Sequence, residues 1–582
     1  MQKDAILKFI YRFFDIFVLA FLVFDFGYSV TEIYKTPKFI GLVSITVALL
    51  AFNVFKFYYY TTTGRKRIAL FNTFILAVLL LMSAVIAVVN LDLHYLSVFR
   101  KIKSVLEVGL FIYFIMRLML LVRYIYQVYY NPAIVFVGSF FVIILVGTIL
   151  LLLPNATTSS GSLTFTDALF TATSAVCVTG LTVINVSKEL TIVGQTILIS
   201  LIQIGGLGIL TFTSFFSFFF RGSSSFREGL NVKDFTAQEN LKDVLKAALN
   251  IVAFTVFIEA IGAIFIYTSI MDSPEVTDKV YFSIFHSISA FCNAGFSIVE
   301  NGFSESYIKF NYYIQWIVMF LIIFGGLGYT IIFNFSQYIK TSVVQFFQRA
   351  SLPKKVRMLS VNAKIVLLTT LLLLVGGFAF FIIAEQNNLL LEHKSYFGKI
   401  TQAAFHSVSP RTAGFNTVDY SQMKVPSLLF MIFLMWVGAS PASTGGGIKT
   451  STFALATLNI LAVARGKNKI QIFGRRISSE STHRAFAILC ISLFVIGAAI
   501  ITILSFEPAG TDVLSVVFEC FSAYSTVGLT MGFTTEMSEP SKYVIIATMF
   551  IGRIGMLNLM IGLLREINHQ FYEYPKENIL IN

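Results

Sequence analysis

Four short strings of the sequence carry residue types that could bind a cation through the main chain. They span residues 174–180, 289–295, 409–414 and 522–528, and each begins with serine and ends with glycine. Glycine accepts a positive φ, which lets successive carbonyl oxygens face one axis. Rings of carbonyl oxygens that replace a hydration shell are the means by which potassium channels select their ion. The strings therefore predict loops that coordinate a cation with backbone oxygens.

The spacing of these strings indicates an internal repeat. The final glycines, Gly180, Gly295, Gly414 and Gly528, are separated by 115, 119 and 114 residues, although the third string is one residue short. A second glycine follows each of them by 24 to 30 residues, at Gly205, Gly325, Gly438 and Gly552. Two of these sites carry the same word, Gly-Gly-Leu-Gly, at 205–208 and 325–328. Such words serve close packing of membrane helices or line a pore, and both readings stay open.

The elements that must position the strings have the same order in each repeat. A long span precedes the string, a short helix of about 12 residues leads into it, and a second long span follows. The expected ranges are 133–153, 163–175 and 190–220; 247–270, 279–291 and 308–339; 364–384, 396–408 and 426–464; 484–506, 511–523 and 541–567. A helix that short cannot cross a bilayer, since crossing takes about 20 residues, so it must enter and turn back. Its C-terminal end carries about half a negative charge and favours a cation.

The composition shows what surrounds these loops. Of 582 residues, 56% are hydrophobic and 13% are charged, and the mean hydropathy is +0.80. These values exclude a soluble assembly of ordinary domains. Non-helical backbone at membrane depth is tolerated where it lines a watery cavity. We therefore expect an all-α integral membrane protein with four helix–pore loop–helix repeats around a central pore.

The chemistry of an enzyme is not indicated. The four cysteines show no metal-type spacing, and no cluster offers a nucleophile with a base or a set of metal ligands. We expect no cofactor bound to this chain.

The net charge of +13 is unevenly distributed between the loops. The segments 340–364 and 465–484 are almost purely basic, whereas acidic residues collect on the other loops. By the positive-inside rule, the basic segments face the cytoplasm. They can also contact anionic membrane lipid, and nucleic-acid binding is not expected.

The first 130 residues differ from the rest. They predict four further spans near 13–31, 39–60, 68–91 and 105–126, which would form an accessory N-terminal transmembrane region. The ion-conducting part would be 131–582, with repeats at about 131–240, 241–355, 356–480 and 481–582.

Three longer motifs resemble the TrkH/KtrB superfamily of potassium transporters. They are Asp-Ala-Leu-Phe-Thr-Ala-Thr-Ser-Ala-Val-Cys-Val-Thr-Gly-Leu at 167–181, His-Ser-Val-Ser-Pro-Arg-Thr-Ala-Gly-Phe-Asn-Thr at 406–417, and Gly-Ala-Ser-Pro-Ala-Ser-Thr-Gly-Gly-Gly-Ile-Lys-Thr at 438–450. The resemblance covers about residues 130–582 and implies potassium uptake across the bacterial inner (plasma) membrane. It also implies a homodimer and a separate cytoplasmic ring of nucleotide-binding subunits. A sodium-coupled or sodium-permeable cation transporter is the alternative.

The resemblance assigns a selectivity filter to the strings, with K⁺ as the bound ion. Thr526-Val527-Gly528 is similar to the core of potassium-channel filters. The implied filter residues are Val178, Thr179, Gly180, Asn293, Ala294, Gly295, Thr412, Ala413, Gly414, Thr526, Val527 and Gly528. In related transporters a serine in place of the first filter glycine accompanies sodium permeation, and this chain retains Gly180. Potassium is therefore expected as cargo, with sodium as a candidate coupling or activating ion.

A gate is expected below the filter. Residues 440–447 contain a proline and three consecutive glycines, which break a helix. Arg553 lies inside the last span, where an unpaired charge costs about 3 kcal/mol, so it should face the pore or pair with carbonyls. By resemblance, these residues form an intramembrane constriction. The implied gating residues are Ser440, Pro441, Ser443, Thr444, Gly445, Gly446, Gly447, Lys449 and Arg553.

Overall fold

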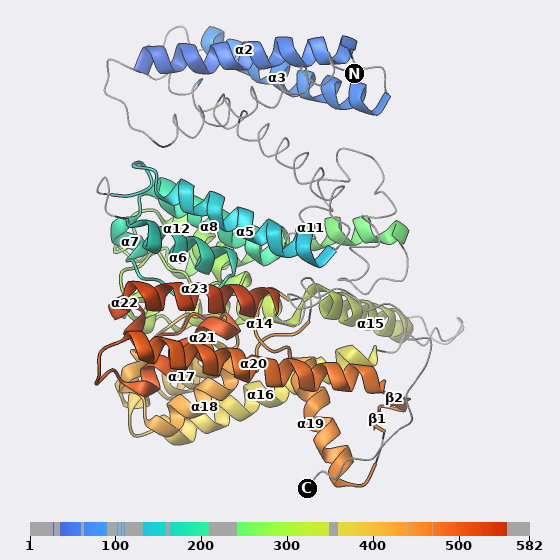
Figure 1. Ribbon diagram of the computed structural model, residues 1–582, viewed down its shortest axis with the longest axis vertical. Helices are drawn as coiled ribbons and strands as arrows, with labels where there is room; N and C mark the ends of the chain where they lie inside the picture. Colours follow the sequence, from blue (N-terminus) through green and yellow to red (C-terminus); the bar gives the residue numbers. More distant parts are fainter. Residues whose placement is uncertain are drawn as a thin grey trace.

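The computed structural model describes residues 27, 35–59, 63–89, 102, 106, 110, 132–158, 163–208, 241–347, 359–441, 443–467 and 469–555. Within these ranges the regular structure is helical apart from one hairpin, β1 (Gln471–Ile472) with β2 (Arg475–Arg476). Four described helices are long and apolar enough to cross a membrane, and a fifth span results if one bent pair is counted together. Figure 1 shows the long helices lying alongside one another.

Four units of one plan make up the part beyond residue 131. Each has a long helix, a short helix, a loop and a second helix. The long helices are α5 (Pro132–Leu151), α11 (Leu241–Ser269), α16 (Val361–Glu385) and α20 (Ser479–Phe506). The short helices are α6 (Phe165–Val176), α12 (Lys279–Phe291), α17 (Tyr396–Val408) and α21 (Val513–Ser525). The second helices are α8 (Ile192–Leu207), α14 (Tyr312–Leu327), α18 (Val425–Trp436) and α23 (Glu539–Ile554).

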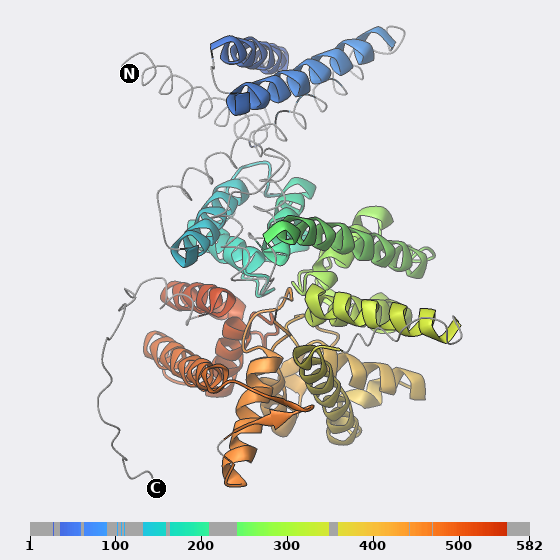
Figure 2. The ribbon, with the colours of Figure 1, turned by 90° about the vertical axis from the view of Figure 1, so that its right-hand side faces the viewer.

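The units follow one another around a common centre. The second helix of each unit packs against the short helix of the next unit, in the pairs α8 with α12, α14 with α17, α18 with α21, and α23 with α6. The last pair returns to the first unit, so the contacts close a ring. Figure 2 looks along the bundle, and its colours pass from cyan through green and yellow to red around the centre.

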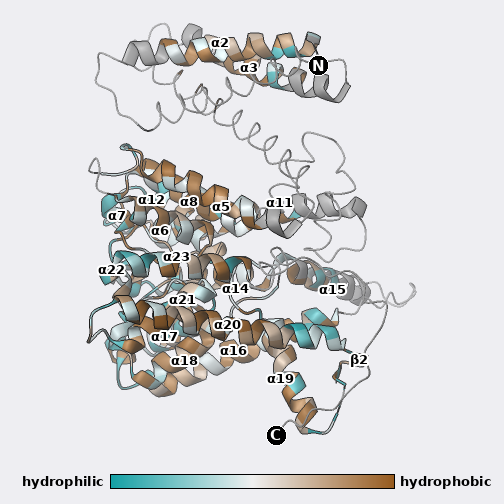
Figure 3. Cartoon of the chain, viewed as in Figure 1, coloured by the Kyte–Doolittle hydropathy of each residue, from teal (hydrophilic) through white to brown (hydrophobic). Residues whose placement is uncertain are grey.

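Apolar residues predominate along the helices, which form the flanks of the bundle, and polar residues gather towards the helix ends and loops, as the hydropathy colours of Figure 3 show. Large apolar side chains project from the flanks, among them Leu372, Phe494 and Ile501, which are 64%, 77% and 72% exposed. Lipid can cover such a surface, whereas water cannot do so without cost. Short elements occupy the end at which the short helices begin. They are α7 (Val186–Glu189), η2 (Gly302–Ser304), α13 (Ser306–Lys309), η3 (Leu389–Glu392), η4 (Tyr420–Gln422) and α22 (Phe533–Glu536).

The N-terminal part contributes two described helices, α2 (Lys35–Tyr59) and α3 (Thr63–Val89). They pack side by side with buried leucines such as Leu42, Leu49 and Leu76 between them. They correspond to the second and third expected spans. The expected spans at 13–31 and 105–126 lie outside the described residues, except for Gly27, Leu106 and Leu110.

The second spans were expected to run unbroken in three units and to be interrupted at 440–447 in the third, and the helices of those three units are shorter than expected. The helices end at Leu207, Leu327, Trp436 and Ile554, well before the predicted ends. Three of these ends are followed by a glycine with positive φ, namely Gly208, Gly328 and Gly555, at +71°, +78° and +83°. Glycine adopts this left-handed conformation readily and thereby ends a helix. After Gly328 the chain continues as α15 (Tyr329–Phe347), which is bent from α14 by 102°.

Candidate ion-conducting site

Each short helix has a defined start. A side chain just before it accepts a hydrogen bond from a backbone N–H of the first turn, which stabilises the helix terminus. These capping residues are Thr164, Asp278, Ser395 and Asp512. The caps lie at the starts of the helices, so their opposite, partially negative ends lead into the four strings.

The backbone of the four strings has one conformation. The residue two places before each final glycine has a positive φ, at Val178 (+56°), Asn293 (+60°), Thr412 (+65°) and Thr526 (+50°). The glycines themselves have φ values of +94°, +70°, +77° and +90°, and the residue between each pair is not left-handed. A left-handed conformation costs energy for any residue other than glycine, and such outliers cluster at functional sites. Here the same outlier occurs four times at one position.

The backbone amides of the strings point back to their own short helix. In each unit the N–H of the residue before the glycine donates to the carbonyl of the serine that begins the string. The four N···O distances are 2.8, 2.7, 3.0 and 2.9 Å, from Thr179 to Ser174, Ala294 to Ser289, Ala413 to Ser409 and Val527 to Ser522. These hydrogen bonds anchor each string to the end of its own short helix.

The four glycines meet in a closed ring. A Cβ atom added at Gly180 would lie 2.3 Å from the carbonyl oxygen of Ala294 in the next unit. The same construction gives 2.7 Å from Gly295 to Ala413, 2.3 Å from Gly414 to Val527, and 2.1 Å from Gly528 to Thr179. Each contact reaches the following unit, and the last returns to the first. The four strings therefore converge on one axis, and none of the four positions has room for a side chain.

The second set of glycines serves close packing. A Cβ at Gly205, Gly325 or Gly552 would lie 2.1, 2.0 or 1.8 Å from a carbonyl oxygen at the end of a short helix. The three oxygens belong to Val176, Phe291 and Tyr524, each four residues before the final glycine of its string. Of the two readings left open for the Gly-Gly-Leu-Gly words, these contacts support packing. The second helix reaches the short helix only because no side chain intervenes.

The loop between α18 and α19 (Thr450–Ala464) lies directly against two of the strings. A Cβ at Gly445 would be 2.1 Å from the hydroxyl oxygen of Thr412, and one at Gly446 would be 2.2 Å from that of Thr526. A parallel bridge between Val437 and Ile448 closes the base of the loop. The helix break expected from Pro441 and the glycines is therefore present, and it places the loop at one mouth of the ring.

Hydrogen bonds tie this loop to the second unit. The N–H of Ser440 donates to the carbonyl of Gly326 at 3.0 Å, and its hydroxyl donates to the same oxygen at 2.9 Å. The hydroxyl of Thr444 donates to the carbonyl of Phe291 at 3.3 Å, at the end of α12. Within the loop, Ser443 donates to the carbonyl of Ser440 at 2.6 Å, and Lys449 donates to that of Gly445.

Arg553 joins the loop to the first unit. Its guanidinium donates to the carbonyl of Thr444 and, at 2.6 Å, to that of Gly205 on α8. The expectation that this arginine would pair with carbonyls is therefore met.

Arg411 is a second arginine in contact with the loop. It lies inside the third string, is 6% exposed, and donates to the carbonyl of Gly438 at 3.1 Å. Arg411 belongs to the motif at 406–417, but the sequence analysis predicted no role for it. The sequence feature that could have indicated a role is its positively charged side chain, at a position where the other strings carry uncharged residues.

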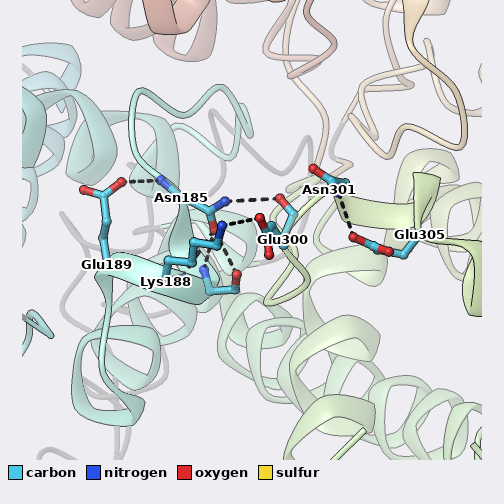
Figure 4. A network of polar contacts seen from close by, with 7 residues as sticks. Asn185, Lys188, Glu189, Glu300, Asn301 and Glu305 are labelled. Atoms are coloured by element: carbon cyan, nitrogen blue, oxygen red, sulfur yellow. Dashed lines mark hydrogen bonds and ion pairs between the residues drawn. The ribbon is translucent and has the colours of Figure 1, made fainter. Parts of the chain in front are cut away.

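The end of the molecule at which the short helices begin carries charged contacts between units. In Figure 4, Lys188 forms an ion pair with Glu300, and the side-chain amide of Asn185 donates to the Glu300 carbonyl at 3.3 Å. Glu189 accepts from the Asn185 N–H at 2.8 Å, which holds the turn in place. These contacts connect the first and second units near the entrance to the ring.

A histidine at the same end is held neutral. His393 lies beside the ion pair of Lys309 with Glu392, and its Nδ1 is 3.0 Å from the hydroxyl of Tyr312. Burial and then the Lys309 ammonium lower the pKa of His393 to about 4. It is therefore uncharged at neutral pH and adds no repulsion to an approaching cation.

Neutral oxygens dominate the site. Among the residues that the structure describes, no group of three or more His, Cys, Asp or Glu side chains could hold a metal ion. Converging carbonyls in a helical membrane protein are the arrangement of a protein that conducts monovalent cations.

Comparisons with known proteins agree with this class. The family described as "TrkH: Cation transport protein" matches residues 108–572. The chain is 36% identical over 457 residues to the potassium/sodium uptake protein NtpJ of Enterococcus hirae, covering 78% of this chain and 97% of that protein. It is 37% identical over 453 residues to the Ktr system potassium uptake protein B of Vibrio alginolyticus, covering 76% and 93%. The chain therefore belongs to the TrkH cation transport family.

The fold agrees with a solved structure of the family. The crystal structure of the potassium transporter TrkH from Vibrio parahaemolyticus matches with a TM-score of 0.58, covering 84% of this chain and 97% of that one. At 17% identity the match concerns the fold alone. The family predicted from the sequence motifs is thus confirmed, and with it a multi-pass membrane transport protein rather than an enzyme.

Proposed function

We propose that this protein takes up potassium across the bacterial plasma membrane, down its electrochemical gradient, through a ring of backbone carbonyls. The filter is made by the three residues that end each string, 178–180, 293–295, 412–414 and 526–528. The observation that carries the proposal is the closed set of contacts in which each filter glycine meets the next unit's carbonyl oxygen. Such oxygens can replace the water around a dehydrated monovalent ion.

Potassium as cargo is supported by the chemistry of the ring and by the relatives. The groups that would surround the ion are neutral carbonyls, and the ends of four short helices add a weak negative potential. That potential favours a monovalent cation without trapping it. The names of the relatives from Vibrio alginolyticus and Bacillus subtilis describe potassium uptake proteins.

The loop at 437–449 and Arg553 serve as the gate in this proposal. Two of the three glycines, Gly445 and Gly446, lie against Thr412 and Thr526 at one mouth of the ring, and Arg553 donates to the Thr444 carbonyl of the same loop. An ion leaving the filter must displace this layer. The positive guanidinium next to the path also raises the barrier for a cation.

A regulatory partner and a homodimer complete the proposed assembly. The printed name of two relatives, Ktr system potassium uptake protein B, supports a system with a further component. Nucleotide-binding subunits would dock on the basic cytoplasmic segments, where the β1–β2 hairpin exposes Arg475 and Arg476. Anionic lipid would contact the same segments. The mass of the purified protein in detergent, alone and with the partner subunit, tests both associations.

We also propose two functional parts. Residues 1–130 would form an accessory bundle of about four transmembrane helices, of which α2 and α3 are two. Residues 131–582 would conduct the ion in four repeats, supported by the common plan of the four units.

A second candidate function has one observation in its favour. The relative from Enterococcus hirae is named a potassium/sodium uptake protein. A sodium-coupled or sodium-permeable transporter is therefore the alternative.

Rubidium flux into liposomes that contain the purified protein separates these candidates. A potassium conduit carries rubidium without sodium, whereas a sodium-coupled transporter requires sodium on the same side. Growth of a potassium-uptake-deficient host on low potassium gives a second readout, with Gly180→Ala as the inactive control. Absence of rubidium flux under both conditions would refute the potassium proposal.

A further inference from the structure

One position of the short helices carries titratable residues that the proposed filter does not use. It lies three residues before the serine that begins each string, and we name it the collar position. Its four occupants are Thr171, His286, His406 and Glu519. All four are fully buried, at 0% exposure. Polar side chains buried at this depth need a structural reason, since burying them without hydrogen bonds is costly.

In the fourth unit the collar residue holds the segment that follows the filter. Oε1 of Glu519 accepts hydrogen bonds from the hydroxyls of Thr530 and Thr534, the latter at 2.8 Å. Thr530 lies two residues beyond the filter glycine, Gly528. Its own oxygen accepts from the N–H of Gly532 at 2.9 Å, which fixes the turn.

The second unit repeats this arrangement with a different residue. Nε2 of His286 lies 2.9 Å from the hydroxyl of Ser297, which is two residues beyond Gly295. Nδ1 lies 2.9 Å from the carbonyl of Phe282, and because a carbonyl only accepts, Nδ1 carries the proton and Nε2 accepts from Ser297. The oxygen of Ser297 accepts from the N–H of Val299 at 3.1 Å, as Thr530 does from Gly532.

The other two units lack this link. Neither the hydroxyl of Thr171 nor either ring nitrogen of His406 has a hydrogen-bond partner among the described residues. The second and fourth units face each other across the ring, because the units follow one another in order around it. The chain therefore contains two linked and two unlinked versions of one position.

We infer that Glu519 and His286 are positioning residues that set the ion selectivity of the filter by holding its outer ends. This inference rests on the proposed function. The hydroxyls of Thr530 and Ser297 lie two residues beyond the filter glycines. Losing the hydrogen bonds to them frees the outer end of the ring, while the hydrogen bonds to the string serines stay intact. A looser ring can contract around a smaller ion, and sodium then competes. The effect of Glu519 exceeds that of His286, because Glu519 accepts from two hydroxyls and His286 from one.

The test compares Glu519→Ala with Thr171→Val, the matched control at the unlinked collar position, by the ratio of rubidium to sodium flux in liposomes. Loss of the two hydrogen bonds lowers the ratio about tenfold, and Thr171→Val leaves it unchanged. Glu519→Gln restores most of it, because the amide oxygen accepts from the same hydroxyls. If Glu519 had only a structural role, Glu519→Ala would lower total flux and leave the flux ratio unchanged. Glu519→Gln would then have no ratio to restore.

A second variant removes the same bond from the other side and avoids an emptied buried site. Thr530→Val lowers the flux ratio about threefold, since one of two donors remains. A wild-type ratio in folded Glu519→Ala, or in Thr530→Val if the first does not fold, overturns the inference. If instead the wild-type protein carries rubidium and sodium equally or carries neither, the proposed function fails before the collar is tested.

Discussion

The ring of strings and the layer beneath it are stabilised in opposite ways. Each string is held by a hydrogen bond within its own unit, from the N–H before the glycine to the serine six or fewer residues earlier. The layer beneath is held by side chains that cross between units, as when Arg553 of the fourth unit contacts Thr444 and Gly205. A small shift of one unit against another would therefore leave the hydrogen bond within each string intact and break the contacts of the lower layer. In the proposed function, the strings would select the ion and the lower layer would respond to a partner.

A second contrast lies within the lower layer. In three units the second helix continues to a glycine whose missing side chain lets it pack on the end of a short helix. In the third unit α18 ends at Trp436, and the loop at 437–449 takes that place. The same site of the scaffold thus serves packing three times and, in the proposed function, closure once.

The largest expected effect is at the ring itself. In Gly528→Ser the new Cβ would overlap the carbonyl oxygen of Thr179, at 2.1 Å, so the ring must widen. We expect the rubidium-to-sodium flux ratio to fall on the order of tenfold or more. Gly497→Ala is the matched control, since nothing lies within 4 Å of a Cβ there. An unchanged ratio in Gly528→Ser would show that the filter is elsewhere.

Removing the arginine tests the lower layer. Arg553→Gln loses charge-assisted hydrogen bonds to the carbonyls of Thr444 and Gly205. At about 1.5 kcal/mol, the lower end of the range for such a bond, we expect flux to rise roughly tenfold with an unchanged flux ratio. Arg484→Gln, which loses only an exposed pair with Glu480, should behave as wild type. A fall in selectivity without a rise in flux would contradict the separation of the two layers.

A smaller change at the same layer comes from Ser440→Ala. The variant loses the hydroxyl donor to the carbonyls of Gly326 and Leu327 and keeps the backbone N–H donor to Gly326. One neutral hydrogen bond contributes about 1 kcal/mol, so we expect flux to rise roughly twofold to fivefold. Ser443→Ala, whose hydroxyl bonds within the loop, serves as the comparison. Equal flux in both variants would mean that the contact with the second unit does not hold the loop.

The smallest effect is expected at the entrance. Lys188→Ala removes an ion pair whose side chains are 59% and 47% exposed. Such pairs contribute about 0.2 to 1 kcal/mol, and salt screens them. We expect thermal unfolding and the flux ratio to stay within error of wild type. A loss of selectivity would show that the entrance, and not the ring alone, discriminates between ions.

The sequence indicated more of the site than of its surroundings. The register of the strings located all four positive-φ turns, and the ranges expected for α12 and α17 agree with the structure to the residue. Arg553 was recognised because a lone charge in an apolar span requires a partner. The ends of the second helices in the first, second and fourth units were missed, because a glycine inside an apolar run is compatible with packing, a break or both.

The sequence by itself determined the strings, their helices and their internal hydrogen bonds, because those contacts join residues close together in the chain. Only the tertiary structure decided that each glycine meets the carbonyl of the following unit, that Arg553 joins Thr444 to Gly205, and that Lys188 pairs with Glu300. The glycine contacts link residues more than a hundred positions apart, and the others depend on how the helices pack around the axis. No local pattern can specify which neighbour a side chain will meet across that ring.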